Sequence, residues 1–272
     1  MGCNRAIGVF DSGLGGLTVV KELLKSMPNE SIIYFGDTGR VPYGTRSHDT
    51  IKKYALEDEN FLLKSDVKLI IAACGTVSSV AADTGDILPV PFFEVVSHTA
   101  KYAAEITKNG KIGVLGTNAT VKSESHKKHI LEYLPSAKVT ASACPMFVSL
   151  VEEGWCADDD VIVLETAKRY LKPIIDAGCD TVILGCTHFP VLKGAIKSIL
   201  GQNVTLVDAG VTTAKVVDEY LKNNNLENSG ESKPLHKFYV SDRPSSFGNI
   251  ASSLLGREIC DSDIIKVDLS KI

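Results

Sequence analysis

The sequence predicts an α/β protein with two similar, doubly wound units whose sheets are mainly parallel. Two short apolar runs support this fold class, because residues 68–74 and 180–186 each end in a cysteine that is followed by small or hydroxyl residues. Runs of this length between turn signals are typical of buried strands in parallel sheets. Strands also alternate with helix-like segments along the chain, which favours a parallel sheet with helices on both faces.

The two matched cysteines, Cys74 and Cys186, would each stand at the carboxyl end of a strand. In open α/β sheets this edge is where ligands bind. Two cysteines placed alike in two units therefore predict two halves that face each other across one cleft, with one cysteine in each half.

The amino-terminal segment begins with an apolar strand at residues 6–10 and a glycine-rich turn at 11–16, which leads into a helix at 17–26 that ends before Pro28. Glycines just before a helix leave backbone N–H groups free to bind an anion. The glycine spacing is not that of a dinucleotide fingerprint, and no P-loop lysine is present, so a small carboxylate fits better than a nucleotide. The alternative, that the glycines only form a tight turn, stays open.

A second strand is predicted at residues 31–35, followed by a loop at 36–44 with glycine, aspartate and proline. Loops of this kind often carry function. An amphipathic helix at about 48–64 then leads to the first cysteine strand. After that strand we expect, in order, a turn-rich passage at 83–91, a strand at 92–96 and a helix through Ile106.

The middle of the chain repeats the amino-terminal plan, since a strand, a Gly/Thr turn and a helix run from residue 111 to about 134. This self-similarity suggests a duplicated unit. The segments before the second cysteine strand are a strand at 139–144, a short helical piece at 147–154, and a helix that Asp158 and its neighbours cap and that ends near Gly178. The remaining predictions are a helix at 191–200, a strand at 204–207, a helix at 208–221, a surface loop at 223–232, and strands at 236–240 and 264–268.

The length of 272 residues is enough for two domains. No linker-like segment separates the two halves, so we expect the second domain to be inserted into the first, with the chain crossing over twice. The predicted first domain comprises residues 1–96 plus 208–272, and the predicted second domain comprises residues 97–207.

The composition excludes several classes of protein. A net charge of -4 argues against a nucleic-acid binder. The amino terminus lacks the pattern of a signal peptide, and no segment reaches the ~18 apolar residues of a membrane span, so we expect a cytoplasmic protein with no membrane partner. The seven cysteines are an odd number without any CxxC pair, which argues against a disulfide framework and against a zinc site.

Cysteines are commonly buried as small hydrophobic residues, and this structural interpretation is kept for Cys3, Cys144, Cys156, Cys179 and Cys260. Cys74 and Cys186 differ, because each lies where a strand gives way to a loop, with a threonine close by. A thiol can act as a carbon base when its neighbours stabilise the thiolate. His188 could reach Cys186 or a bound carboxylate, and Asp11 could play the matching part for Cys74. A capping or core role for His188 stays open.

Five segments in order along the chain resemble the successive motifs of the glutamate racemase family: residues 10–18 (FDSGLGGLT), 34–44 (YFGDTGRVPYG), 116–120 (GTNAT), 144–154 (CPMFV and LVEEG) and 185–190 (GCTHFP). The resemblance extends from near residue 6 to about residue 210, and the last sixty residues are less distinctive. It implies a cofactor-independent amino-acid racemase of the aspartate/glutamate racemase superfamily. Members of that superfamily have two similar α/β domains with the active site in the cleft between them.

The resemblance also implies roles for individual residues. Cys74 and Cys186 would be the two acid/base residues, one on each face of the substrate Cα. Asp11 and His188 would assist Cys74 and Cys186 respectively, with Glu152 as a further helper in preference to Glu153. The matching substrate-binding positions are Asp11, Ser12, Tyr43, Gly44, Gly75, Thr76, Thr117, Thr120, Thr187 and His188. We expect glutamate as the substrate, D-glutamate for peptidoglycan as the product, no cofactor, and a homodimer.

The chemistry explains the need for two thiols. Inverting a stereocentre by proton transfer requires a base on one face of the carbon and an acid on the other. Without pyridoxal phosphate to delocalise the carbanion, donors must surround the α-carboxylate as charge develops there. Closing the cleft would strengthen these contacts by excluding water.

One position departs from the resemblance, because Gly75 stands where the family usually has asparagine. Either water or another residue fills the gap, or the preferred substrate has changed, for example to aspartate or to several acidic amino acids. A non-catalytic binding protein of the same fold is the alternative from another class, and both cysteines, Asp11 and His188 argue against it. A thiol hydrolase would need one nucleophile with an oriented base and would not explain a second matched cysteine.

Overall fold

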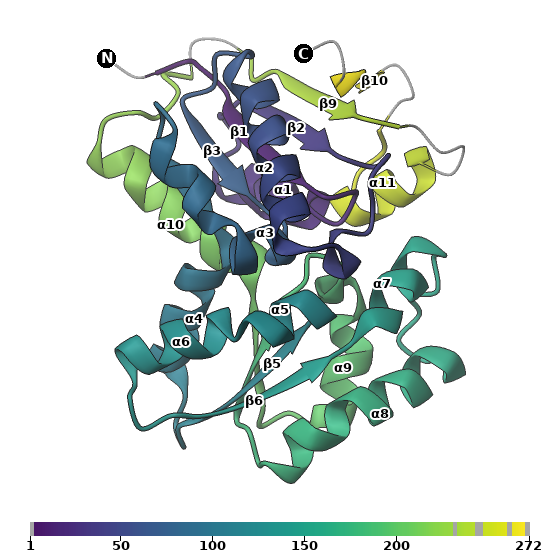
Figure 1. Ribbon diagram of the computed structural model, residues 1–272. Coiled ribbons are helices and arrows are strands. Elements are labelled where there is room, and N and C mark those ends of the chain that lie inside the picture. The colour runs from purple at the N-terminus through teal and green to yellow at the C-terminus, as the bar shows by residue number, and fades with distance from the viewer. Residues whose placement is uncertain (1–2, 231–232, 243–246, 260–262, 270–272) are drawn as a thin grey trace.

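Two parallel sheets, one in each half of the molecule, form the framework of the fold (Figure 1). The computed structural model describes residues 3–230, 233–242, 247–259 and 263–269. In that part of the chain the larger sheet consists of β1 (Ile7–Asp11), β2 (Ile32–Gly36), β3 (Leu69–Ala72), β4 (Phe92–Glu94), β9 (His236–Val240) and β10 (Ile264–Lys266). Its strand order is β10-β9-β2-β1-β3-β4.

The smaller sheet consists of β5 (Lys111–Gly116), β6 (Lys138–Ala143), β7 (Thr181–Leu184) and β8 (Thr205–Asp208), in the order β6-β5-β7-β8. Each strand pair among the described residues of both sheets is parallel. The predicted parallel sheets are therefore confirmed. Each sheet places the carboxyl ends of its strands along one edge, and these edges carry the predicted site residues.

Helices cover both faces of the larger sheet, as the alternation of its side chains requires. Val9 points to the core beneath α1 (Leu17–Ser26), α10 (Ala209–Asn223) and α11 (Phe247–Leu255). Its neighbour Phe10 points to the opposite core, beneath α2 (His48–Leu63). Tyr34 and Phe35 of β2 divide in the same way, so this half is doubly wound.

The smaller sheet is covered on both faces as well. Leu115 and Leu184 pack toward α8 (Val161–Asp176) and α9 (Lys193–Leu200). Val114 and Ile183 pack toward α4 (Val95–Ile106) and α6 (Ser125–Tyr133). The prediction of two similar α/β units is confirmed. The remaining short elements at the cleft are α3 (Gly75–Val80), α5 (Asn118–Ser123), α7 (Pro145–Glu152) and the 3-10 helices η1 (Tyr43–Thr45), η2 (Ala82–Ile87) and η3 (Phe189–Leu192).

Several boundaries differ from the sequence prediction. Val95 and Val96 begin α4 instead of ending β4, because the Glu94 carboxylate caps the helix by accepting from the N–H groups of Val96 and Ser97 at 2.6 and 2.8 Å. The helix expected to reach residue 134 is broken into α5 and α6 at Glu124, whose φ of 55° is left-handed. Neither α3 nor α11 was predicted as a helix.

The division into domains stays a prediction, which the membership of the sheets supports. β1 to β4, β9 and β10 belong to one sheet and β5 to β8 to the other, so the chain passes between the halves near β4 and near β8. Residues 231–232 of the predicted surface loop, and Cys260, lie outside the described residues. No helix in the described part of the chain is long and apolar enough to cross a membrane.

Candidate active site

The carboxyl ends of both sheets open onto a cavity of about 410 Å³ between the two halves. Ligand pockets in proteins commonly have volumes of about 300 to 1,000 Å³. Of the predicted site residues, those that line this cavity are Ser12, Tyr43, Gly44, Cys74, Gly75, Thr76, Thr117, Glu152, Cys186, Thr187 and His188. The structure thus gathers residues from distant parts of the sequence around one space.

Two predicted residues do not line the cavity. Asp11 is buried behind the first glycine-rich turn, where its Oδ2 accepts from the N–H of Gly13 at 3.1 Å. Thr120 is buried behind Thr117, and the two hydroxyl oxygens are 3.0 Å apart. Glu153, over which Glu152 was preferred, is also outside the lining and borders a neighbouring cavity.

Sequence reasoning missed several residues of the lining: Gly13, Val41, Pro42, Thr45, Asn118, Pro145, Val148 and Ser149. Most of them lie inside or directly beside the recognised motifs, so they could have been predicted from the motif positions. Ser149 lacks such a signal, because it lies between the two parts of one motif and reaches the cavity only through the turn of α7.

Cys74 follows β3 and occupies the position just before α3, where it is buried. Its Sγ donates to Ser12 Oγ at 3.5 Å. Burial, together with the negative charge of Asp11, raises the pKa of the Cys74 thiol to about 12, although hydrogen bonds from Ser12 and Val77 partly oppose this rise. Cys74 is therefore a protonated thiol at neutral pH.

Asp11 lies beside Cys74. Burial raises the pKa of its carboxyl, while the charge of His188 and the N–H groups of Gly16 and Gly13 act in the opposite direction. Asp11 Oδ1 is buried and has no hydrogen-bond partner among the described residues. A buried carboxylate oxygen without a partner is costly, so a ligand or a proton that satisfies it would be favoured here.

Cys186 has different surroundings. Its Sγ lies 3.7 Å from Nδ1 of His188, and Nε2 of His188 lies 3.3 Å from Oε1 of Glu152. Burial alone would lower the pKa of His188, but the interactions with Cys186 and Glu152 outweigh it and raise this pKa to about 10. A protonated His188 ring at neutral pH would stabilise a negative charge on the Cys186 sulfur. The two thiols thus have opposite electrostatic environments, one beside a carboxylate and one beside a cation.

Hydroxyl groups bridge the two halves at the cavity. Thr76 at the start of α3 and Thr117 at the start of α5 have hydroxyl oxygens 3.2 Å apart. Thr117 also caps α5 by accepting from the N–H of Thr120 at 3.2 Å. These hydroxyls, together with Ser12 and Thr187, are the kind of donors that can bind a carboxylate.

The two halves contact each other at the carboxyl ends of their sheets, through the start of α1 and through the turns that carry the two cysteines. The Thr18 hydroxyl donates to the carbonyl oxygen of Thr187 at 2.8 Å. A Cβ at position 75 would lie 2.4 Å from the carbonyl oxygen of Gly185, a distance that real Cβ atoms do not adopt. Glycine at position 75 therefore permits a backbone-to-backbone contact between the two halves. At Gly15 the close neighbours are side chains instead, because a Cβ there would lie 2.2 Å from the Thr187 hydroxyl oxygen.

The six cysteines in the described part of the chain are all free thiols. A search of the same residues finds no cluster of three or more histidine, cysteine or acidic side chains that could hold a metal ion. The chemistry that the described residues can supply is acid/base chemistry by thiols, an imidazole and carboxylates, with hydroxyl and N–H donors around them.

Comparisons with known proteins point to one family. A family model described as Asp/Glu/Hydantoin racemase matches residues 7–217. The chain is 42% identical over 268 residues to a glutamate racemase of Geobacter metallireducens and 43% identical over 272 residues to one of Neisseria meningitidis serogroup A, and each match covers 98% of both chains. A crystal structure of glutamate racemase from Francisella tularensis in complex with D-glutamate superposes with a TM-score of 0.90 at 38% identity, covering 99% of both chains.

The ion pair between Glu152 and His188 can be tested by titration. Glu152→Gln should lower the pKa of His188 from its value of about 10, because the carboxylate that stabilises the imidazolium is lost. The His188 ring signals, followed by NMR against pH, should then show a midpoint at lower pH. Glu153→Gln is the matched control, since Glu153 is adjacent, exposed and outside the lining. An unchanged midpoint in Glu152→Gln, or an equal change in Glu153→Gln, would contradict the assignment.

Proposed function

The chain belongs to the Asp/Glu/Hydantoin racemase family, and from this premise we propose that it is an isomerase that interconverts L-glutamate and D-glutamate with two cysteine thiols. The observation that carries the proposal is the placement of Cys74 and Cys186 after strands of two different sheets, on the lining of one cavity. The glutamate racemases to which the chain is 42% and 43% identical support this substrate.

In the proposed reaction a thiolate removes the Cα proton from one face of glutamate, and the thiol of the other cysteine donates a proton to the opposite face. The bond from Cα to hydrogen breaks as a new S–H bond forms, and the second thiol becomes a thiolate. In one direction Cys186, beside the protonated His188, acts as the base, and Cys74, whose thiol pKa is raised, donates the proton. The opposite direction of reaction requires the opposite protonation states.

The side chains around the thiols have supporting roles. His188 stabilises negative charge at Cys186, and Glu152 keeps the imidazole protonated. Asp11 assists Cys74, because a buried carboxylate beside the thiol can hold a proton as the sulfur gains or loses its own. The hydroxyls of Ser12, Thr76, Thr117 and Thr187 bind the substrate carboxylates and stabilise the charge that develops during proton removal. Tyr43, Gly44 and Gly75 complete the wall of the substrate cavity, while Thr120 orients Thr117.

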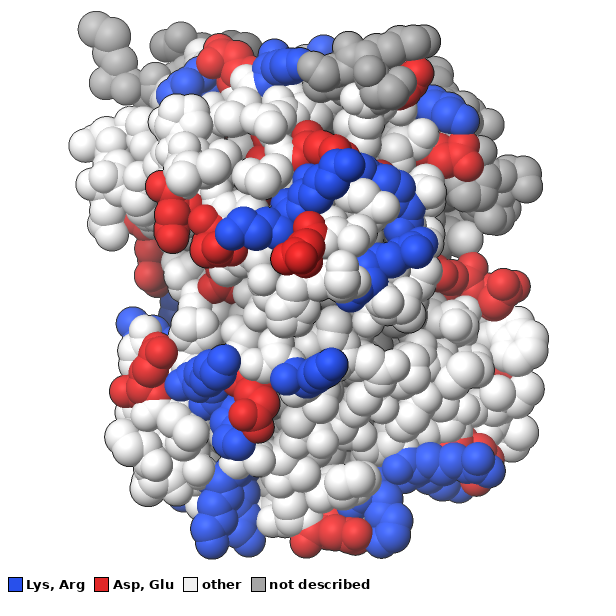
Figure 2. Space-filling view, viewed as in Figure 1, with Lys and Arg blue, Asp and Glu red and all other residues white. Residues whose placement is uncertain are grey.

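This chemistry needs no cofactor, because both proton transfers and the stabilisation of the carbanion use side chains of the chain itself. The cellular role is supply of D-glutamate for peptidoglycan, in the cytoplasm and as a homodimer. A nucleic-acid partner is not part of the proposal. In support, the net charge is -4, and Figure 2 shows acidic and basic side chains interspersed on the face that it displays.

The proposal can be tested by proton NMR of the purified protein in deuterated buffer without added cofactor. D-Glutamate, L-glutamate and L-aspartate are incubated separately, and each is followed for loss of the Cα–H signal and for appearance of the other enantiomer. Exchange from both glutamate enantiomers with interconversion is expected. Exchange with aspartate alone would mean that aspartate, not glutamate, is the substrate, and would connect this change in substrate preference to Gly75. No exchange with any of the three amino acids would contradict a racemase function.

The contact at position 75 predicts an effect on the rate. Gly75→Ala should force the two cysteine turns apart, because the new Cβ would clash with the carbonyl oxygen of Gly185. A displacement of about 1 Å at the reacting groups can lower kcat/KM on the order of 10²-fold. Steady-state kinetics measures this loss in both directions, while thermal unfolding checks that the variant is folded. A folded Gly75→Ala protein with wild-type kcat/KM would show that this contact does not set the geometry of the site.

A further inference from the structure

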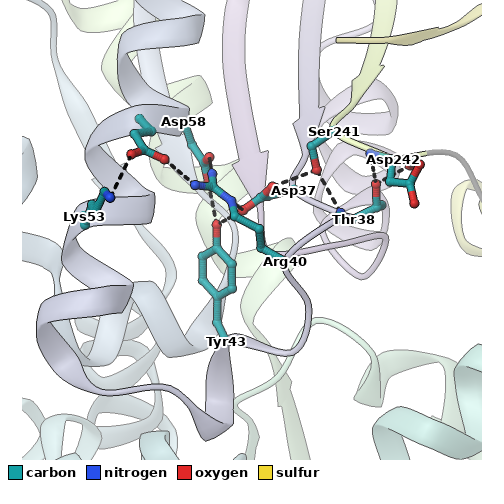
Figure 3. A network of polar contacts seen from close by, with 10 residues as sticks. Asp37, Thr38, Arg40, Tyr43, Lys53, Asp58, Ser241 and Asp242 are labelled. Carbon is teal, nitrogen blue, oxygen red and sulfur yellow. Dashed lines mark hydrogen bonds and ion pairs between the residues drawn. The ribbon is translucent and has the colours of Figure 1, made fainter. Parts of the chain in front are cut away.

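One wall of the cavity is formed by residues 41–45, all of which line it. This 41–45 wall belongs to the loop after β2 and includes η1. Behind it lies a cluster of charged and polar side chains that centres on Arg40 and that the proposed chemistry does not use (Figure 3).

Arg40 connects the loop to α2. Its Nε donates to Asp37 Oδ2 at 2.5 Å, and its Nη2 donates to Asp58 Oδ1 at 3.1 Å. A third interaction joins Nη1 to Glu57. The guanidinium also lies 4.0 Å from the ring centroid of Tyr54, which is a cation–π distance. All three nitrogens of the Arg40 guanidinium are thus engaged by carboxylates, and the group also packs over an aromatic ring.

Tyr43 extends the cluster into the wall. Its hydroxyl donates to Asp58 Oδ2 at 3.0 Å and also contacts Asp37. The side chain is buried, with its hydroxyl turned toward the cluster (Figure 3). The wall residue Tyr43 is therefore held from behind by the same two carboxylates that hold Arg40.

The carboxyl end of β9 forms the third side of the cluster. Ser241 donates from Oγ to Asp37 Oδ1 at 2.7 Å and accepts from the N–H of Gly39 at 2.8 Å. The N–H of Asp242 donates to the Thr38 hydroxyl at 3.0 Å. The loop before the wall is consequently fixed by two segments that lie far from it in the sequence.

The charges of the cluster depend on the arginine. Asp37 and Asp58 are both fully buried, and a buried carboxylate is stable only when it is paired or protonated. Burial and the charge of Asp37 raise the pKa of Asp58, and the guanidinium of Arg40 opposes this rise. A lysine would present one ammonium where the planar guanidinium now reaches three carboxylates, so it could not replace the same contacts.

We propose that Arg40 is a positioning residue that holds the 41–45 wall in its substrate-binding shape through Asp37, Asp58 and Tyr43. This inference rests on the function proposed above. Arg40 does not line the cavity, and neither thiol belongs to the wall. Loosening the wall lowers the fraction of molecules that are ready to bind substrate, and apparent affinity falls in proportion to that fraction.

Arg40→Lys tests this role, with Arg46→Lys as the matched control on the same loop, where the side chain is exposed and outside the lining. In Arg40→Lys, KM for both glutamate enantiomers should rise about tenfold, while kcat should stay within about threefold of wild type. This pattern is expected when fewer molecules have the wall in its substrate-binding shape. Tyr43→Phe keeps the ring but removes the hydroxyl contacts, so it should raise KM in the same way by a smaller factor. Arg46→Lys should leave both constants unchanged.

Amide hydrogen exchange of residues 38–46 provides a second readout that does not need turnover. Faster exchange in Arg40→Lys than in wild type or Arg46→Lys is expected. Unchanged exchange and unchanged KM would overturn the proposal. A loss of kcat at constant KM, in step with loss of folded protein, would also overturn it, because that result indicates a role in stability alone. If wild type fails to turn over glutamate, the proposed function fails, while the exchange data still decide whether Arg40 orders the wall.

Discussion

The direct contact between the two cysteine turns is the constraint on which the rest of the site depends. Gly75 approaches the carbonyl oxygen of Gly185 so closely that no Cβ fits between them, and Thr18 donates across the same boundary to Thr187. Cys74 precedes Gly75 and Cys186 follows Gly185. The relative placement of the two thiols is therefore set by the backbone at the ends of two buried strands, which is far more rigid than side-chain contacts alone would be.

This geometry suits acid/base catalysis because the charges next to the two thiols are opposite in sign. Burial and Asp11 keep Cys74 protonated, with its pKa raised to about 12, whereas the cation of His188 lies beside Cys186 and owes its pKa of about 10 to Cys186 and Glu152. A thiol that keeps its proton and a sulfur with a cation beside it thus line the same cavity. The two thiols come together because one strand from each parallel sheet ends at the same cavity.

Most strands and long helices could be predicted from the sequence, because buried parallel strands such as β1, β3, β5 and β7 are short apolar runs between turn signals. The α3 helix was missed because Gly75–Val80 contains small, hydroxyl and β-branched residues without a helical pattern. The break at Glu124 has no glycine to indicate it. The motifs located most of the cavity lining. The hydrogen bond between Asp37 and Ser241 could not be predicted, because these residues are 204 positions apart and come together only through the pairing of β2 with β9.

The most direct test of the two-thiol account compares Cys74→Ser, Cys186→Ser and the control Cys179→Ser, whose thiol is buried away from the cavity. Production of the opposite glutamate enantiomer is measured in both directions for each folded variant. The account predicts that both site variants lose interconversion by about 10² to 10⁴-fold, the usual contribution of one acid/base group, while Cys179→Ser keeps wild-type turnover. Near wild-type interconversion in either Cys74→Ser or Cys186→Ser would contradict the central claim that one thiol acts on each face of the substrate.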